Sequence, residues 1–303
     1  EDQNNYDMIN DVYKNRSCLG CFSSSLSIYS TNFKKIFRGT WAWTLALSVV
    51  IGLMTFVSNT LAQQSYSNLQ IICSLGICCA LAVFGLFLDA IVKTNVITML
   101  NDDKLNVVFK KMLLIDVLMI VWTVLSTIIF VASTYLLISI DWIKSLPAST
   151  FGVLLVAIYM CMFLLMSIII SPYIYSVSKF AINNNSKFKN VIGSDYAIGY
   201  KKLGYLFSIF LLLILVGAIV CSFLCIPGIV TNIATNINNF GVMQGDESGI
   251  PNHFQWLNFL ATVISTFIIQ YVFLWVMFVF LYAFGNVEVC VNNNLLSEET
   301  KLA

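Results

Sequence analysis

Charged residues are scarce in this chain: Asp, Glu, Lys and Arg make up 10% of its 303 residues. A typical soluble domain carries about 25%, so the composition excludes an ordinary soluble protein. Hydrophobic residues reach 59% and the mean hydropathy is +0.85, as expected of an integral membrane protein. The net charge of +1 gives no sign of a nucleic-acid partner, because the distribution of charge between the two membrane faces matters more than its sum.

Catalytic motifs are also missing. The chain has a single histidine, His253, and no Gly-rich phosphate loop, GxSxG or HExxH sequence. One histidine excludes nucleophile and base pairs that depend on histidine, and the other motifs carry phosphate, acyl or zinc chemistry. We therefore predict a protein that is not an enzyme and that holds no cofactor.

The chain also lacks a basic N-terminal segment that is followed within a few residues by an apolar stretch. The first residues include Glu1, Asp2 and Asp7, and the first apolar stretch begins near Trp41. A cleavable signal peptide begins basic and turns apolar within a few residues. We expect no such signal here, a loosely ordered polar segment over 1–21, and a first span that serves as an uncleaved signal anchor.

Long apolar stretches are what the chain does have. They predict an all-α polytopic membrane protein with six transmembrane helices in three hairpins and with interfacial amphipathic helices. Pro172 is expected to close the fourth span and Pro227 to interrupt the fifth. The predicted regions are a cytoplasmic polar segment with an interfacial helix (1–40), a transmembrane domain (41–285, with spans at about 41–61, 69–92, 113–138, 150–171, 204–226 and 256–284) and a cytoplasmic tail (286–303).

An aromatic-Lys-Lys-apolar pattern precedes each hairpin, at 33–36, 109–112 and 200–203. Each copy ends an expected amphipathic lead-in. The second begins with a cap at Asn101 and Asp102, and the third with a cap at Ser194 and Asp195. Internal duplication and independent selection of good anchors both explain so short a repeat. Either way, lysine fixes the depth of a helix because a cation at the bilayer centre costs roughly 3 kcal/mol. The predicted membrane anchors are Lys34, Lys35, Lys110, Lys111, Lys201 and Lys202.

The cations are sorted to one side of the predicted topology. If the N-terminus is cytoplasmic, every Lys and Arg except Lys144 falls on the inner face, fifteen of the sixteen. This asymmetry follows the positive-inside rule. We expect a multi-pass protein of the bacterial cytoplasmic (inner) membrane with both termini in the cytoplasm.

Two acids, Asp89 and Asp116, lie within apolar stretches near their inner ends. An ionisable residue in a span is a functional candidate, for example in a proton or cation relay. The alternative is structural: Asp89 pairs with Lys93 one turn later, and Asp116 reaches Lys93 or extends to the interface.

Two further groups suggest metal or redox chemistry. Cys18 and Cys21 have CxxC spacing, but a structural zinc needs four ligands and no second pair is present in the predicted cytoplasmic segments. A site shared between subunits, or a redox pair, stays open. His253, near Asp246 and Glu247 in the expected outer loop, could hold a divalent metal weakly or belong to a solvated loop.

Small and polar residues form stripes along three spans. They line span one (Thr44, Ser48, Gly52, Thr55, Asn59), span five (Gly217, Cys221, Cys225) and span six (Asn258, Thr262, Thr266, Gln270). In lipid, such stripes are typical of helix packing surfaces. A solute pathway would use the same residue types, but no span combines a deep charge with a Gly/Pro break at mid-membrane.

The C-terminal third contains four distinctive runs, 227–232, 241–246, 249–251 and 282–288. They resemble uncharacterised six-helix inner-membrane proteins of Bacteroidota type that often carry a beta-carotene monooxygenase label, and more distantly YciC-like envelope proteins and the membrane domain of some glycerophosphodiester phosphodiesterases. The resemblance implies a cytoplasmic-membrane protein, but carotenoid cleavage enzymes hold iron with four histidines and this chain has one. The matched positions are Gly245, Asp246, Gly249 and Pro251, expected to form a structural turn in the outer loop, and Gly285 and Glu288.

These observations favour a non-enzymatic accessory or scaffold subunit. Its expected partners are membrane lipid and either another membrane protein or a second copy of the chain, with no nucleic acid. The alternative is a transporter or channel for a small solute or lipid, with a polar cavity that reaches Asp89 or Asp116.

Overall fold

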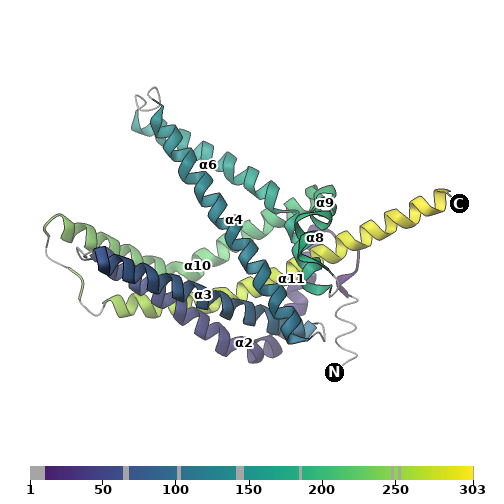
Figure 1. The fold of residues 1–303 in the computed structure, drawn as a ribbon, viewed down its shortest axis with the longest axis horizontal. Coiled ribbons are helices and arrows are strands. Elements are labelled where there is room, and N and C mark those ends of the chain that lie inside the picture. The colour runs from purple at the N-terminus through teal and green to yellow at the C-terminus, as the bar shows by residue number, and fades with distance from the viewer. Residues whose placement is uncertain are drawn as a thin grey trace. The chain divides into compact units, whose positions relative to one another are not determined.

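The computed structural model describes residues 11–63, 68–100, 104–140, 147–183, 186–246, 249–251 and 254–302. Within these ranges the chain is helical and contains no strand. Six of its helices are long and apolar enough to cross a membrane, which confirms the all-α polytopic fold. The helices are α2 (Cys18–Gln63), α3 (Asn68–Leu100), α4 (Leu105–Ser139), α6 (Ala148–Ile170), α7 (Tyr173–Ile182), α8 (Phe188–Ile192), α9 (Ser194–Lys201), α10 (Leu203–Met243) and α11 (Phe254–Leu302) (Figure 1).

The helices form two compact units. Unit 1 contains residues 22–109 and 213–279, and therefore most of α2, all of α3, the C-terminal part of α10 and the N-terminal part of α11. Unit 2 contains residues 10–21, 110–212 and 280–303. Because α2, α4, α10 and α11 each contribute to both units, neither unit is a separate stretch of sequence.

In unit 1, α2 and α11 run antiparallel and their aromatic rings interleave. Phe37 contacts both Phe267 and Tyr271, with ring centroids 6.5 and 5.4 Å apart, and the Tyr29 hydroxyl donates to the carbonyl oxygen of Tyr271 at 2.8 Å. Farther along, a Cβ atom on Gly52 would lie 2.6 Å from Val263 Cγ2. The absence of a side chain at Gly52 therefore lets the two helices approach closely.

Helix α3 packs antiparallel to α2 in the same unit (Figure 1). Leu47 and Val50 form a buried cluster with Leu88, and Asn95 Nδ2 donates to the Gly39 carbonyl oxygen at 3.3 Å. The hydroxyl residues on this part of α2 are fully buried and bond to carbonyls one turn earlier, which satisfies them without another helix; they are Thr40, Thr44 and Ser48.

Three helices of unit 1 share a polar network near the start of α11. Asn258 Oδ1 accepts from Thr231 Oγ1 at 2.9 Å, and Asn258 Nδ2 donates to Asn232 Oδ1 at 3.0 Å. Asn232 Oδ1 also accepts from Asn59 Nδ2 at 3.3 Å. Gly52, Asn59 and Asn258 thus serve helix packing, one of the two functions predicted for the stripes. The Gly217 stripe differs, since a Cβ there would meet nothing within 4 Å.

Helix α10 does not end at Pro227, as the sequence predicts, but continues to Met243. A proline removes one backbone hydrogen bond from a helix. In a membrane, ending the helix would leave more unpaired backbone groups, which lipid cannot satisfy. Thr231 Oγ1 also bonds the carbonyl oxygens of Pro227 and Gly228, at 3.0 and 3.1 Å.

The interfacial lead-ins also differ from expectation in their boundaries. Residues 26–37 contain no Gly or Pro and continue into the first span as part of α2. The cap predicted at Ser194 and Asp195 is wrong, because both residues lie inside α9 and Gly193 precedes the helix with no side-chain cap bond. The cap expected at Asn101 and Asp102 lies outside the described residues.

Unit 2 consists of a long hairpin and a group of short helices. The hairpin helices α4 and α6 are held together by rings of Phe130 and Tyr159, 5.5 Å apart, and by a hydrogen bond between Thr134 and Tyr159 (Figure 1). The fourth span ends before Pro172, as predicted. Beyond it, α7 packs against α9 where a Cβ on Gly199 would lie 2.5 Å from the Pro172 carbonyl oxygen.

Candidate functional site

A charge cluster in unit 2 joins α7, α9 and the C-terminal part of α11. We define it as Tyr175, Lys179, Asp195 and Glu288. Lys179 Nζ lies 3.2 Å from Asp195 Oδ1 and 4.0 Å from Glu288 Oε1. Lys179 also donates to the Tyr175 hydroxyl at 3.2 Å, and that hydroxyl donates to Glu288 Oε2 at 2.6 Å. The Tyr175 hydroxyl thus bridges Lys179 and Glu288.

Local sequence explains two of these positions. Tyr175 and Lys179 are four residues apart on α7, so they share a face one turn apart. Asp195 occupies the first turn of α9, where the helix dipole favours a negative charge. Tyr175 and Asp195 are buried, and buried charges are stable only when paired and hydrogen-bonded.

Residues 11–17, which we call the N-terminal clasp, contact α11 one turn before Glu288. The Tyr282 hydroxyl donates to Asp11 Oδ2 at 2.9 Å, and the Arg16 backbone amide donates to Asn286 Oδ1 at 2.8 Å. The Arg16 guanidinium bonds Asp11 Oδ1 at 2.8 Å and lies over the Tyr282 ring, 4.9 Å from its centre. These bonds tie the clasp to a single face of α11.

Gly285 makes this contact sterically feasible. A Cβ atom at this position would lie 2.2 Å from the carbonyl oxygen of Val12 and 2.7 Å from its carbonyl carbon. No side chain fits there unless the backbone of the clasp moves. Gly285 and Glu288 are the two α11 positions that the family resemblance singled out, and both contribute to this end of unit 2.

The clasp perturbs two titratable groups. Burial opposes ionisation of Asp11, but hydrogen bonds from Lys14 and Tyr282 and the charge of Arg16 outweigh it and lower the pKa of this carboxyl below its ordinary value. Burial, followed by the nearby charge of Glu288, raises the pKa of the Tyr13 phenol.

Chemically, the cluster and the clasp are saturated with internal partners. Lys179 and Asp11 have three partners each, and Glu288 has two. A substrate would have to displace several charge-assisted bonds to reach any of these groups. The arrangement is therefore suited to holding α7, α9, α11 and the clasp together, and it forms the rigid base of unit 2.

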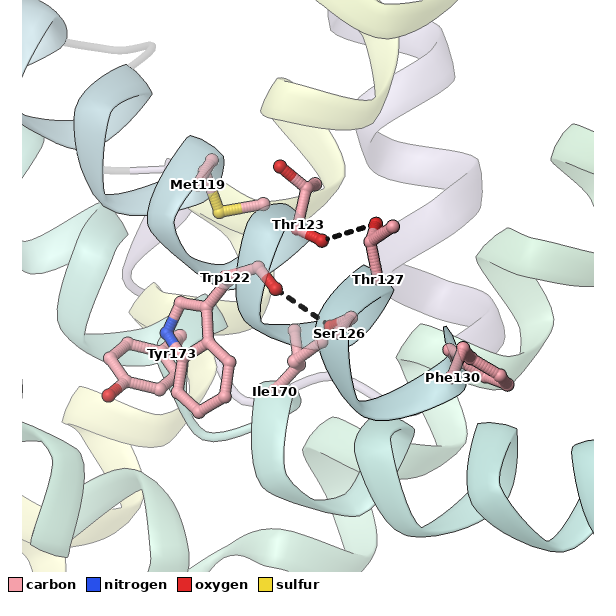
Figure 2. Close-up of a pocket in the computed structure, with 8 residues that line it drawn as sticks. All are labelled: Met119, Trp122, Thr123, Ser126, Thr127, Phe130, Ile170 and Tyr173. Atoms are coloured by element: carbon pink, nitrogen blue, oxygen red, sulfur yellow. Dashed lines mark hydrogen bonds between the residues drawn. The ribbon is translucent and has the colours of Figure 1, made fainter. Parts of the chain in front are cut away.

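An apolar groove runs along the α4–α6 hairpin of the same unit. Its volume is about 310 Å³, and eight residues line it (Figure 2): Met119, Trp122, Thr123, Ser126, Thr127, Phe130, Ile170 and Tyr173. Figure 2 shows the rings of Trp122 and Tyr173 together at one end, with centroids 5.6 Å apart, and Phe130 at the other. The hydroxyl groups in the groove bond to their own helix; for example, Ser126 Oγ donates to the Trp122 carbonyl oxygen at 2.7 Å.

Of the two predicted intramembrane acids, Asp89 forms an ion pair in unit 1. Its Oδ2 atom lies 2.6 Å from Lys93 Nζ, one helical turn away, which is the pairing expected of a structural role. Asp116 is buried in unit 2 with 4% of its surface exposed. It therefore does not extend into solvent.

Gln244 and Gly245, in the stretch where a structural turn is predicted, form a turn after α10. Gly245 has a φ of +97°, a conformation that favours glycine. The Asp246 amide donates to the Gly241 carbonyl oxygen at 3.0 Å, and the Gly249 amide donates to Asn238 Oδ1 at 3.0 Å. The carbonyl oxygen of Pro251 then accepts from the amide of Phe254, where α11 begins. The loop thus bonds back to α10.

The predicted anchor lysines fall into two groups. Lys34, Lys35, Lys110 and Lys201 are exposed and Lys202 is half-buried. Lys111 is buried, and its Nζ donates to the Asn183 carbonyl oxygen at 2.9 Å and lies over the Phe180 ring. Lys111 therefore supports the C-terminal end of α7.

The thiol pair is divided between two environments. Cys18 is half-buried, whereas Cys21 is buried and its sulfur lies 2.9 Å from the Tyr205 hydroxyl. His253 lies outside the described residues. In the part of the chain that the structure describes, no three His, Cys, Asp or Glu residues gather closely enough to hold a metal ion.

Sequence reasoning missed the charge cluster and most of the clasp. The only usable signals were the i, i+4 spacing of Tyr175 and Lys179 and the matched positions Gly285 and Glu288. Asp11, Arg16 and Asp195 gave no such signal, because their partners are up to 271 residues away.

No protein family, curated protein or solved structure matches this chain. The resemblance of residues 227–288 to the six-helix inner-membrane family stays a prediction.

Proposed function

We propose that this integral membrane protein is a non-enzymatic accessory subunit whose α4–α6 hairpin binds a transmembrane helix of another membrane protein. One observation carries the proposal. The most apolar stretch of α6 is 6% buried and that of α4 17%, against 33% for α2 and for α11; α10, which contributes to both units, has 11% and α3 has 22%. The α4–α6 hairpin therefore has the least buried apolar stretch of the described helices in α6, and the charge cluster holds together α7, α9 and α11, which follow it in unit 2.

The chemistry of the groove favours a helix as the occupant. Thr123, Ser126 and Thr127 line the groove at spacings that place them along one side of α4. Lipid needs no such stripe, whereas a second helix approaches closely over small residues. The rings of Trp122, Tyr173 and Phe130 rise around this stripe. The partner we propose presents a face of Gly, Ala or Ser with one larger apolar side chain for the groove.

The charge distribution supports the location that we propose for this interaction. Fifteen of the sixteen cations fall on one side of the predicted topology, and the positive-inside rule then favours cytoplasmic termini. We propose the bacterial cytoplasmic membrane as the location. The partner is then a protein of the same membrane.

Site-specific photocrosslinking in intact cells tests the proposal. A benzophenone amino acid replaces Thr123 or Thr127 in the groove, and matched controls replace Val121 or Ile128, which are exposed in the structure and lie on the other side of α4. We expect one discrete adduct from the groove positions, none from the controls, and loss of the adduct when Ser126→Trp fills the groove.

Three results would contradict the proposal. Adducts of equal yield from both sides of α4 would indicate random encounters. Adducts to lipid alone would indicate that lipid, and no partner helix, surrounds the hairpin. A crosslink between two differently tagged copies of the chain would replace the heterologous partner by self-association.

A further inference from the structure

A cationic hollow lies in unit 1, on residues that the proposed function does not use. Its volume is about 510 Å³, and it lies between α2 and the C-terminal end of α3. The lining residues are Thr31, Asn32, Lys34, Lys35, Arg38, Gly39 and Met99. Three of the seven carry a positive charge, and none is acidic.

The three cations are available for an external anion. Lys34, Lys35 and Arg38 are exposed. No ion pair or hydrogen bond engages their side chains within the ranges that the structure describes. This differs from Lys93 and Lys179, whose charges are neutralised by carboxylates of the chain itself. A cation cluster without internal acids attracts anions with strong hydrogen-bond acceptors, above all phosphate.

The neighbouring residues place the hollow at the depth of lipid headgroups. Trp41 follows Arg38 by three residues and Lys34 by seven, so all three share one side of α2. Trp41 and Trp43 are 48% and 44% exposed, as is typical of the aromatic belt at the boundary of the membrane. Met99 supplies an apolar wall, close to Gly39, where a Cβ would lie 2.1 Å from Met99 Cε.

We propose that this hollow binds the phosphate group of an anionic membrane lipid. Lys34, Lys35 and Arg38 contact the phosphate oxygens, and the acyl chains extend along the apolar part of α2 beyond Trp41. Lys34 and Lys35 then bind a lipid phosphate in addition to the anchoring role predicted from sequence. This lipid binding is independent of the partner helix proposed for unit 2.

The test measures lipid selectivity by electron paramagnetic resonance of spin-labelled lipids around the intact protein in nanodiscs. We expect the wild type to prefer phosphatidylglycerol to phosphatidylcholine. The triple variant K34Q/K35Q/R38Q should lower this preference at least about fivefold, the effect of one cation at a membrane surface. The control K187Q/K189Q/K201Q removes the same charge from exposed positions of unit 2 and should keep the preference.

Two further arms distinguish the alternatives. K34R/K35R keeps the charge and should keep the selectivity, which separates loss of binding from misfolding. Inorganic phosphate, added at constant ionic strength, should not displace the labelled phosphatidylglycerol. Displacement would assign the hollow to free phosphate and overturn the lipid proposal. Equal loss in the triple variant and its control, or no loss in the triple variant, would also overturn it.

Discussion

The two units of this protein are stabilised in different ways. Unit 1 packs aromatic rings, small residues and amides between long helices, as where Tyr271 contacts α2 and Asn258 contacts α10. Unit 2 is held at one end by ion pairs and a backbone contact at Gly285, while its hairpin stays exposed. In unit 1 these contacts hold α2 against α10 and α11, whereas in unit 2 they are concentrated at one end and leave the hairpin exposed. Substitutions at these contacts should therefore act differently in the two units.

The largest effect is expected at Gly285. In Gly285→Ala the new Cβ would collide with the Val12 carbonyl group, and backbone atoms yield less easily than a side chain. We expect the free energy that holds the N-terminal clasp closed to fall by about 2–3 kcal/mol, so that the clasp is released. Trypsin cleavage after Arg16 in nanodiscs should then accelerate at least about thirtyfold, since cleavage follows the population of the open form.

The control for this variant is Gly204→Ala in the same unit, where a Cβ meets nothing within 4 Å. It should leave the cleavage rate unchanged. An unchanged rate in Gly285→Ala would show that the clasp is not held by this contact.

The second prediction concerns the charge cluster. Tyr175→Phe removes the phenol that accepts from Lys179 and donates to Glu288. A hydrogen bond to a charged group contributes about 1.5–3 kcal/mol, and part of it is screened here because the Glu288 side chain is 25% exposed. We expect a loss of about 1–2 kcal/mol in the unfolding of unit 2, measured by hydrogen exchange of α7 and α9. Equal loss of protection in α3 would contradict a local role.

In unit 1, two polar positions on α11 should respond in opposite ways. Asn258→Ala breaks bonds to Thr231 and Asn232 and should cost about 1 kcal/mol, the scale of interhelical bonds in membranes. Ser265→Ala removes a buried hydroxyl that has no hydrogen-bond partner in the described part of the chain. It should be neutral or slightly stabilising. The stabilities of the two variants are compared by thermal unfolding in the same detergent. Equal losses of stability in both would contradict the prediction.

The smallest effect is a dependence of the clasp on pH. Because the folded structure lowers the pKa of Asp11, the carboxyl stabilises the clasp fully above its ordinary pKa of about 4. This stability is lost as the pH falls through the lowered value. A spin-labelled amino acid at Asn15 should gain mobility below about pH 4. The variant Asp11→Asn should be mobile already at pH 7 and show no such step.

More of the contacts in unit 1 than in unit 2 could be predicted from the sequence. The stripes on α2 and α11 correctly indicated packing at Gly52, Asn59 and Asn258, because small and amide residues in lipid have few other uses. The predicted turn at Gly245 follows equally from local chemistry. The charge cluster could not be predicted, because Lys179 has several acids of the chain as conceivable partners and only the packing of α7 on α9 selects Asp195. For the same reason the cap predicted at Asp195 is wrong.

The class of the protein and its six apolar helices could be predicted from the amino-acid sequence. These depend on composition and on runs of neighbouring residues, and lipid allows few backbone structures across it. Tertiary packing, in contrast, brings the clasp onto Gly285 and gathers Lys34, Lys35 and Arg38 around a hollow with Met99. Each of these contacts joins residues whose separation in the chain gives no local signal, so each depends on how the helices pack.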